Sequence, residues 1–298
     1  MNFRCSVAGL ERGDPLAGTA STVRSFLLVE NPGPWGIDAL HDSRLPPEVK
    51  DGLREAAARA RVRPLLIRRY HRRAPREGFR VYAAHVGRDL GWLQTAVLDD
   101  AQELLDLDVA ALGAGRSPGL VPAEGPVFFV CTHGKHDACC AEKGRPVAAA
   151  LSAAYPDQTW EVSHIGGDRY AGNALVLPDG LYLGRLDADS AVAAADDLLG
   201  GRLPLDVLRG RSNLPMAAQA GEIALFRHLG ETAMAAIHVL GHHRRDDLTT
   251  VDLARSEEHW RVVVRTTLGP GALLTCHARR ENPTPRHEVV GIEHVGVS

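Results

Sequence analysis

Three of the five cysteines lie in one short segment, which is the first candidate for chemistry. Residues 130–140 read VCTHGKHDACC, so eight residues separate Cys131 from Cys140, and Cys139 directly precedes Cys140. Cys131 ends an apolar run typical of a buried strand, and Cys140 stands at the start of the following helical pattern. Because a helix N-terminus favours thiolate over thiol, the two sulfurs suit a soft metal or a redox reaction.

A second segment, HIGGDRYAGN at residues 164–173, begins where the next predicted strand ends. His164 and Asp168 are separated by Ile-Gly-Gly, and paired glycines permit close approach of the backbone to a bulky group. Two thiolates from one segment, with an imidazole and a carboxylate from the other, form a candidate four-point site.

The elements that must position these segments follow one order twice. The first series is a strand at 21–30, a helix at 46–60, strands at 63–69, 78–86 and 92–98, and a helix from 99 or 100 to 112. The second series is a strand at 126–133, a helix at 141–155, strands at 158–163, 173–177 and 181–185, and a helix at 188–199. The order β-α-β-β-β-α is that of the thioredoxin-like fold, although short elements of any α/β protein can coincide in this way.

We therefore predict an α/β protein with two tandem thioredoxin-like units and a small C-terminal α+β appendage. The expected domains are residues 1–118 without a metal motif, 119–212 with the Cys-x8-Cys and HxGGD motifs, and 213–298 as the appendage. In the appendage the patterns predict a connector at 209–215, helices at 217–229 and 231–241, strands at 260–267 and 273–278 around a turn at 269–271, and a last strand at 287–297.

Composition excludes several classes of protein. The 298 residues carry 34 basic and 37 acidic side chains, so no electrostatic footprint indicates nucleic acid binding. No apolar run reaches the length of about 18 residues that a membrane helix needs, and the first residues lack the apolar core of a signal peptide. Few, unevenly placed cysteines argue against a secreted disulfide framework, so we expect a reduced cytoplasmic compartment.

Longer segments around both motifs resemble the sucrase/ferredoxin-like family of thioredoxin-like [2Fe-2S] proteins. These segments are VCTHGKHDACCAEKGRPVA, WEVSHIGGDRYAGNALVLPDGLYLGRL, ERGDPLAGTAS and LLVENPGPWG, and the resemblance extends to about residue 215. It implies an electron-transfer protein whose cluster is held by Cys131 and Cys140 on one iron and by His164 on the other. Members of the family have HxGGH, whereas Asp168 occupies the place of the second histidine here.

The identity of the fourth ligand is therefore left undecided between three alternatives. Asp168 is the ligand, the adjacent Cys139 takes its place, or this branch of the family has lost the cluster. Neutral imidazoles raise the potential of a cluster relative to four thiolates. A carboxylate at the fourth place restores one negative charge, and we expect a lower potential than that of a site with two histidines.

Two other functions compete with electron transfer. The first is a structural zinc site that uses Cys131, Cys140, His164 and Asp168. The second is a thiol oxidoreductase that uses Cys139 and Cys140 or Cys131, which is the weaker reading because no CxxC is present and adjacent cysteines form strained disulfides. We expect an electron carrier rather than an enzyme, served by a redox partner protein that the sequence does not identify.

The remaining candidates have simpler interpretations. His133 and His136 suit polar loop residues that support the ligands, and Asp137 suits a helix cap at Cys139. Cys5 and Cys276 are interpreted as incidental or structural.

Overall fold

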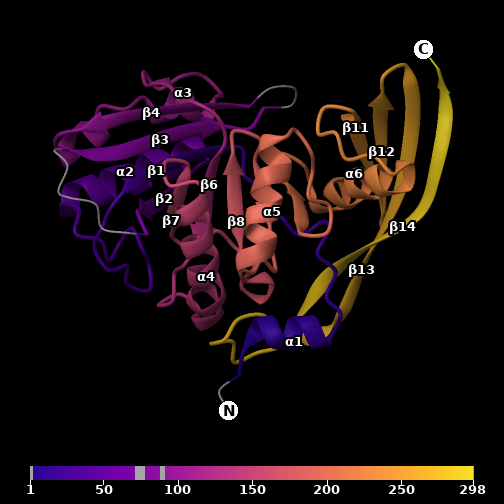
Figure 1. Cartoon of the computed structure of the whole chain (residues 1–298), viewed down its shortest axis with the longest axis horizontal. Coiled ribbons are helices and arrows are strands. Elements are labelled where there is room, and N and C mark those ends of the chain that lie inside the picture. The colour runs from indigo at the N-terminus through magenta and orange to yellow at the C-terminus, as the bar shows by residue number, and fades with distance from the viewer. Residues whose placement is uncertain (1–2, 71–77, 88–90, 298) are drawn as a thin grey trace.

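The structure is a computed structural model that describes residues 3–70, 78–87 and 91–297. Within these ranges, ten strands form one curled sheet in the order β10-β9-β8-β6-β7-β2-β1-β3-β4-β5 (Figure 1). The first elements are α1 (Cys5–Glu11), β1 (Ser25–Glu30), α2 (Pro47–Ala60), β2 (Val62–Arg68), β3 (Phe79–His85), β4 (Trp92–Leu98), the 3-10 helix η1 (Ala101–Leu105), α3 (Val109–Gly113) and β5 (Val121–Pro122). They are followed by β6 (Val127–Cys131), α4 (Ala138–Ala154), β7 (Thr159–Val162), the 3-10 helix η2 (Asp168–Tyr170), β8 (Ala174–Leu177), β9 (Leu181–Leu183), α5 (Ala188–Leu199), β10 (Leu208–Arg211) and α6 (Met216–Leu229).

The two halves of the large sheet share one pairing pattern. β1 pairs parallel with β2 and antiparallel with β3, which pairs antiparallel with β4. In the same way, β6 pairs parallel with β7 and antiparallel with β8, which pairs antiparallel with β9. The halves join where β2 and β7 run antiparallel.

The mixed α/β class expected from the sequence is confirmed by this arrangement. Each parallel pair is connected by one helix, α2 or α4, as parallel neighbours require a crossover. The finer description as two tandem thioredoxin-like units stays a prediction, and so do the domain boundaries after residues 118 and 212.

The apolar core explains why β6 is apolar throughout. Every residue of β6 is buried, because both faces of this strand are covered. Phe128 and Val130 pack in the cluster that includes α4, α5 and α6. Phe129 and Cys131 point to the opposite face, into a cluster that β1, β2 and β3 share with β7, β8 and β9. The first candidate sulfur therefore lies in the apolar region between the halves of the sheet.

The C-terminal part is a separate antiparallel sheet that packs on α6. Its strands are β11 (His238–Arg245), β12 (Leu248–Arg255), β13 (Glu258–Ala272) and β14 (Asn282–Val297), paired in sequence order. In Figure 1, β13 and β14 extend away from the other two strands toward α1. The segment that connects β13 to β14 contacts α1 through Cys276 and Cys5.

Several predicted elements of the C-terminal part are wrong. The helix expected at 231–241 is not formed, because its second half enters β11, a mostly exposed strand that shows no clear apolar period. The turn expected at 269–271 lies inside β13, where a shift in register accommodates Pro270, and residues 273–278 form no strand. The single helix expected to end at 112 is η1 and α3, which have separate caps at Asp100 and Asp108. The sequence patterns also missed α1, β10 and β12.

Close packing of α4 on β6 generates the first prediction. A Cβ on Gly144 of α4 would overlap the carbonyl oxygen of Cys131. We expect Gly144→Ala to lower the free energy of unfolding by about 3 kcal/mol, because a rigid backbone atom must move to make room. Urea unfolding measures this loss.

The matched control is Gly52→Ala in α2. A Cβ there would approach only the end of the Leu105 side chain, which is 44% exposed and free to turn away. We expect the free energy of unfolding to stay unchanged or to increase by up to about 1 kcal/mol, since alanine is a better helix former than glycine. Equal losses in the two variants would show that α4 does not press on Cys131.

Candidate metal centre

The two cysteines of the Cys-x8-Cys motif converge where β6 ends and α4 begins. Cys131 is the last residue of β6, Cys140 lies in the first turn of α4, and each is 1% exposed. The side chain of Asp137 caps α4 by accepting a hydrogen bond from the Cys139 backbone amide at 2.9 Å, as the sequence predicted. The N-terminus of this 17-residue helix therefore favours negative charge beside the sulfurs.

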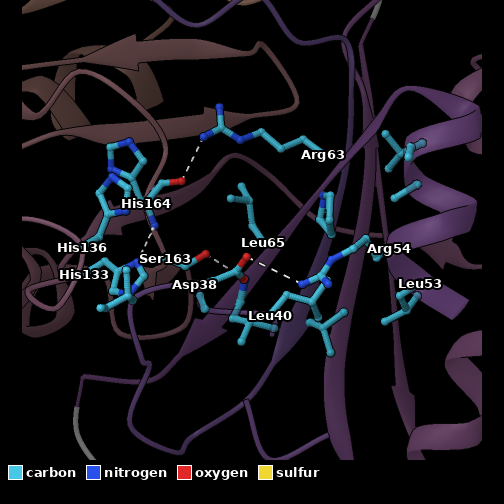
Figure 2. Close-up of a pocket in the computed structure, with 18 residues that line it drawn as sticks. Asp38, Leu40, Leu53, Arg54, Arg63, Leu65, His133, His136, Ser163 and His164 are labelled. Carbon is cyan, nitrogen blue, oxygen red and sulfur yellow. Dashed lines mark hydrogen bonds and ion pairs between the residues drawn. The ribbon is translucent and has the colours of Figure 1, made fainter. Parts of the chain in front are cut away.

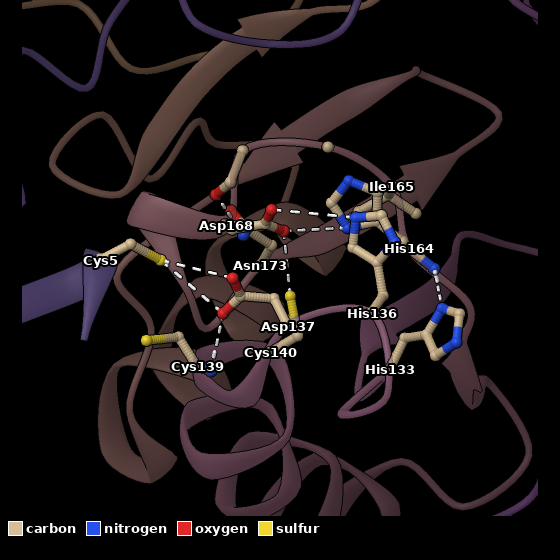
Figure 3. A network of polar contacts seen from close by, with 12 residues as sticks. Cys5, His133, His136, Asp137, Cys139, Cys140, His164, Ile165, Asp168 and Asn173 are labelled. Atoms are coloured by element: carbon tan, nitrogen blue, oxygen red, sulfur yellow. Dashed lines mark hydrogen bonds and ion pairs between the residues drawn. The ribbon is translucent and has the colours of Figure 1, made fainter. Parts of the chain in front are cut away.

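The loop after β7 brings the second motif to the same place (Figure 3). His164 Nδ1 lies 3.0 Å from Asp168 Oδ1, and this carboxylate oxygen also accepts a hydrogen bond from Cys140 Sγ at 3.3 Å. The ligand atoms of Cys131, Cys140 and His164 all lie within 4.8 Å of one another. All four residues singled out by the two motifs thus meet at one site.

Cys139 lies in a different group of side chains. Its Sγ is 3.4 Å from Cys276 Sγ and accepts a hydrogen bond from the Ser6 hydroxyl at 3.2 Å. Figure 3 shows the Cys139 sulfur directed to the side of Cys5, whereas the Cys140 sulfur points toward Asp168. The two adjacent cysteines therefore belong to two different groups of side chains.

The loop between β6 and α4 contributes two histidines. His136 stacks on His164 with ring centroids 3.7 Å apart, and its Nε2 lies 3.8 Å from Asp168 Oδ2, so His136, His164 and Asp168 form a further group of possible ligands. From its sequence context, His136 is predicted only to be a supporting loop residue. The signal that singles it out is its place in the segment between the candidate ligands Cys131 and Cys140.

His133 supports the site by binding the backbone next to it. Its Nε2 donates to the backbone carbonyl of Gly36 at 2.6 Å, and its Nδ1 accepts from the backbone amide of His164 at 3.3 Å. Burial lowers the pKa of His133. A neutral ring with one donor and one acceptor therefore fixes the His164 backbone relative to the N-terminal half of the chain, which agrees with the supporting role expected for it.

The four residues of the site share charge and protons. Contact with the Cys140 thiol is the main cause that holds the pKa of Cys131 well below its ordinary value, and the same contact raises the pKa of Cys140. Burial would lower the pKa of His164, but Asp168 and Cys131 outweigh it and raise this pKa to about 9. Burial would raise the pKa of Asp168, yet His164 brings it below its usual range. Without a metal, these contacts thus favour the charged forms of Cys131, Asp168 and His164 and the protonated form of Cys140.

A buried arginine from β10 shapes the glycine loop. Arg209 is 1% exposed and donates to the carbonyl of Gly166 at 3.0 Å and to Asn173 Oδ1 at 2.8 Å. Gly167 has a φ of 85°, and a Cβ there would overlap the guanidinium of Arg209. Gly167 thus makes room for Arg209, whereas a Cβ on Gly166 would overlap the hydroxyl of Ser21. The role of Arg209 could not be foreseen from the sequence, where residues 209–215 are predicted to be a connector.

A cavity of about 620 Å³ borders the imidazole side of the site (Figure 2). Residues of α2 and β2 line it together with His133, His136 and His164. The side chains of His136 and His164 are 35% and 21% exposed, whereas the two cysteines are sealed in the core. The two imidazoles are therefore the side of the candidate site that other molecules can reach.

The family model for sucrase/ferredoxin-like proteins matches residues 16–210. The chain belongs to this family. The matched stretch contains all four residues of the candidate centre, whereas Cys5 and Cys276 lie outside it. No curated protein and no solved structure matches the chain. Within the part of the chain that the structure describes, helices lack the combination of length and apolar character that crossing a bilayer requires.

The raised pKa of His164 generates a prediction for the metal-free form of this sucrase/ferredoxin-like protein. Because the pKa rises on folding from about 6.5 to about 9, the stabilisation is complete below the lower value and is lost as pH rises through the upper one. The contribution of His164 is a loss of at most about 3 kcal/mol in the free energy of unfolding, since each pKa unit corresponds to about 1.4 kcal/mol. The lowered pKa of Cys131 contributes with the opposite sign as pH rises toward the ordinary value of a thiol, so the net loss is smaller. Urea unfolding of the unsubstituted protein and of the control variant, on both sides of this range, measures the His164 contribution as the difference.

The control is Asp168→Asn, which keeps the shape of the side chain but removes the charge that stabilises the imidazolium. In this variant the loss of stability with rising pH should shrink markedly. An unchanged pH profile would assign the loss to groups other than His164.

Proposed function

We propose that this protein is an electron carrier that binds a [2Fe-2S] cluster. Cys131 and Cys140 are assigned to one iron, and His164 and Asp168 to the other. The observation that carries the proposal is the convergence of two buried thiols and an imidazole, with ligand atoms within 4.8 Å of one another, beside a carboxylate. The unit that holds them, residues 119–212, is proposed to be of the thioredoxin-like ferredoxin type.

The chemistry of these side chains fits such a cluster. Thiolate and imidazole are the ligand types of [2Fe-2S] centres with mixed coordination. When bound, the cluster supplies one-electron oxidation and reduction. The chain supplies a helix N-terminus toward the two sulfurs and an apolar enclosure around them, since Cys131 and Cys140 are part of the inner core cluster.

The exposure of the ligands indicates where a redox partner protein docks. The sulfurs are buried, but His136 and His164 border the cavity between α2, β2 and the loop before α4. We infer that electrons enter and leave on this imidazole side. Because imidazole titrates, His164 is also the group through which a proton can be bound on reduction. All five cysteines are free thiols, which suits a reduced cytoplasmic compartment.

A zinc ion is the second candidate occupant. The mutual spacing of Cys131, Cys140 and His164 also suits one ion, with Asp168 as the fourth ligand, and such a closed site is structural. The thiol oxidoreductase reading gains no support, because the sulfurs of Cys139 and Cys140 belong to separate groups and do not face each other.

Metal and sulfide content tests the cluster directly. Anaerobically purified protein should be brown, with about two irons and two acid-labile sulfides per chain attributable to a [2Fe-2S] centre. Cys131→Ser or Cys140→Ser should lose most of the colour because a thiolate ligand is removed. Absorption spectra and iron and sulfide assays measure both results.

The matched control is Thr132→Val next to Cys131. The Thr132 hydroxyl is buried and makes no hydrogen bond within the described part of the chain, so a side chain of the same shape should keep the colour. If the protein is colourless and contains one zinc ion that is lost in Cys131→Ser, the site binds zinc and not a cluster. Full colour in Cys131→Ser would remove this residue from the ligands.

The identity of the fourth ligand sets the reduction potential. We expect Asp168→His to raise the potential, because a neutral imidazole replaces a negative carboxylate and reduced cluster is then less disfavoured. A redox titration measures the shift, and His136→Ala serves as the comparison. If Asp168→His leaves the potential unchanged while His136→Ala loses the colour, the fourth ligand is His136.

A further inference from the structure

The three cysteines outside the candidate centre are gathered around one carboxylate. Cys5 comes from α1, Cys139 from the first turn of α4, and Cys276 from the segment between β13 and β14. Asp137, the cap of α4, completes the group. We propose that these four residues bind a structural zinc ion, distinct from the cluster assigned to Cys131 and Cys140.

The distances already have the spacing of a zinc site. Cys139 Sγ and Cys276 Sγ are 3.4 Å apart, Cys276 Sγ and Cys5 Sγ are 3.7 Å apart, and Cys5 Sγ lies 3.7 Å from the oxygens of Asp137. Ligands about 2.3 Å from zinc at the corners of a tetrahedron lie about 3.8 Å from one another. A disulfide needs about 2.05 Å between sulfurs, so the group matches a metal site better than a bridge.

Polar contacts hold the four possible zinc ligands in place. Asp137 accepts from the backbone amide of Cys139 at 2.9 Å through Oδ1 and from that of Cys276 at 2.6 Å through Oδ2. A carboxylate has about four acceptor positions, so it can keep both amides and still bind a cation. The Ser6 hydroxyl donates to Cys139 Sγ at 3.2 Å, which is the kind of outer contact that orients a metal ligand.

Ordinary packing gives no reason for this arrangement. Cys5 and Cys139 are 0% and 1% exposed, and Asp137 is 0% exposed, yet the surrounding cluster holds only Ala171 besides the three cysteines. Three sulfurs thus face a buried carboxylate where an apolar cluster would normally hold aliphatic side chains. A divalent cation compensates the negative charge of thiolates and carboxylate, and soft sulfur ligands in a tetrahedron select zinc.

The site fastens distant parts of the chain. Cys5 and Cys276 are separated by 271 positions, and the segment with Cys276 has left the C-terminal sheet to reach α1. With four protein ligands the coordination is closed, which is the arrangement of structural rather than catalytic zinc. The ion would fix α1 and the end of the β13–β14 hairpin to the first turn of α4.

The test measures zinc and visible colour in the full chain, expressed with zinc and iron and purified without chelators. We expect about one zinc per chain, lost in Cys5→Ser and in Cys276→Ser, as removal of a ligand from a tetrahedral site requires. The same variants should keep the brown colour. Cys140→Ser is the matched control next to Cys139, because it should lose the colour and keep the zinc. His277→Ala should keep both.

A measurement on the unsubstituted chain guards against variants that fail to fold. Co²⁺ added to zinc-depleted protein should give the intense visible bands of tetrahedral thiolate coordination, and added Zn²⁺ should abolish them. Absence of zinc together with absence of these bands would overturn the proposal. It would also be overturned by a zinc content that is the same in the Cys5→Ser/Cys276→Ser double variant as in the unsubstituted chain, or by a Cys139–Cys276 disulfide found by mass spectrometry. A zinc ion held at the first centre in place of the cluster would be lost in Cys140→Ser and kept in the double variant, so failure of the cluster assignment leaves this result readable.

Discussion

The first turn of α4 is the constraint on which the rest of the site depends. Asp137 caps it, and the next residues place one sulfur on each side of the turn. One turn therefore supplies a sulfur atom to each of two groups of possible metal ligands that have different partners. The helix N-terminus favours negative charge for both, and Gly144 allows the helix to lie against the carbonyl of Cys131.

The glycine loop is the matching constraint on the other side. Its conformation depends on Arg209, whose guanidinium is buried between the rings of Tyr170 and Tyr182 and the loop carbonyl of Gly166. Burial lowers the pKa of this arginine to about 10, and oriented carbonyl oxygens and aromatic rings balance its charge. The loop that carries His164 is thus held by a residue from a strand at the edge of the sheet.

The sequence predicted the part of the site that local pattern encodes. Cys131, Cys140, His164 and Asp168 could be brought together from strand ends and one helix start, because parallel neighbours place their ends at one edge. The contributions of Arg209, of His136 stacking and of the Cys139–Cys276 contact could not be read in this way. They depend on contacts between residues far apart in sequence, and nothing in the local spacing records these.

The difference between local pattern and long-range contacts also explains which elements were predicted wrongly. The buried strands and α4 follow clear apolar periods, whereas β11 is mostly exposed and carries none. Gly269-Pro270-Gly271 has the composition of a turn, but pairing with β14 keeps it in a strand. Tertiary pairing thus overrides local propensity where burial is weak.

The wide separation of Cys5 and Cys276 has a consequence for the order in which the molecule is completed. Synthesis proceeds from the N-terminus, and domains fold as they emerge. The proposed ligands of the first centre all lie between residues 131 and 168, so they are present together well before Cys276 has been made. The second group stays incomplete until Cys276 has left the ribosome. The proposed zinc site would therefore close after the first centre and mark a chain that has been translated at least as far as Cys276.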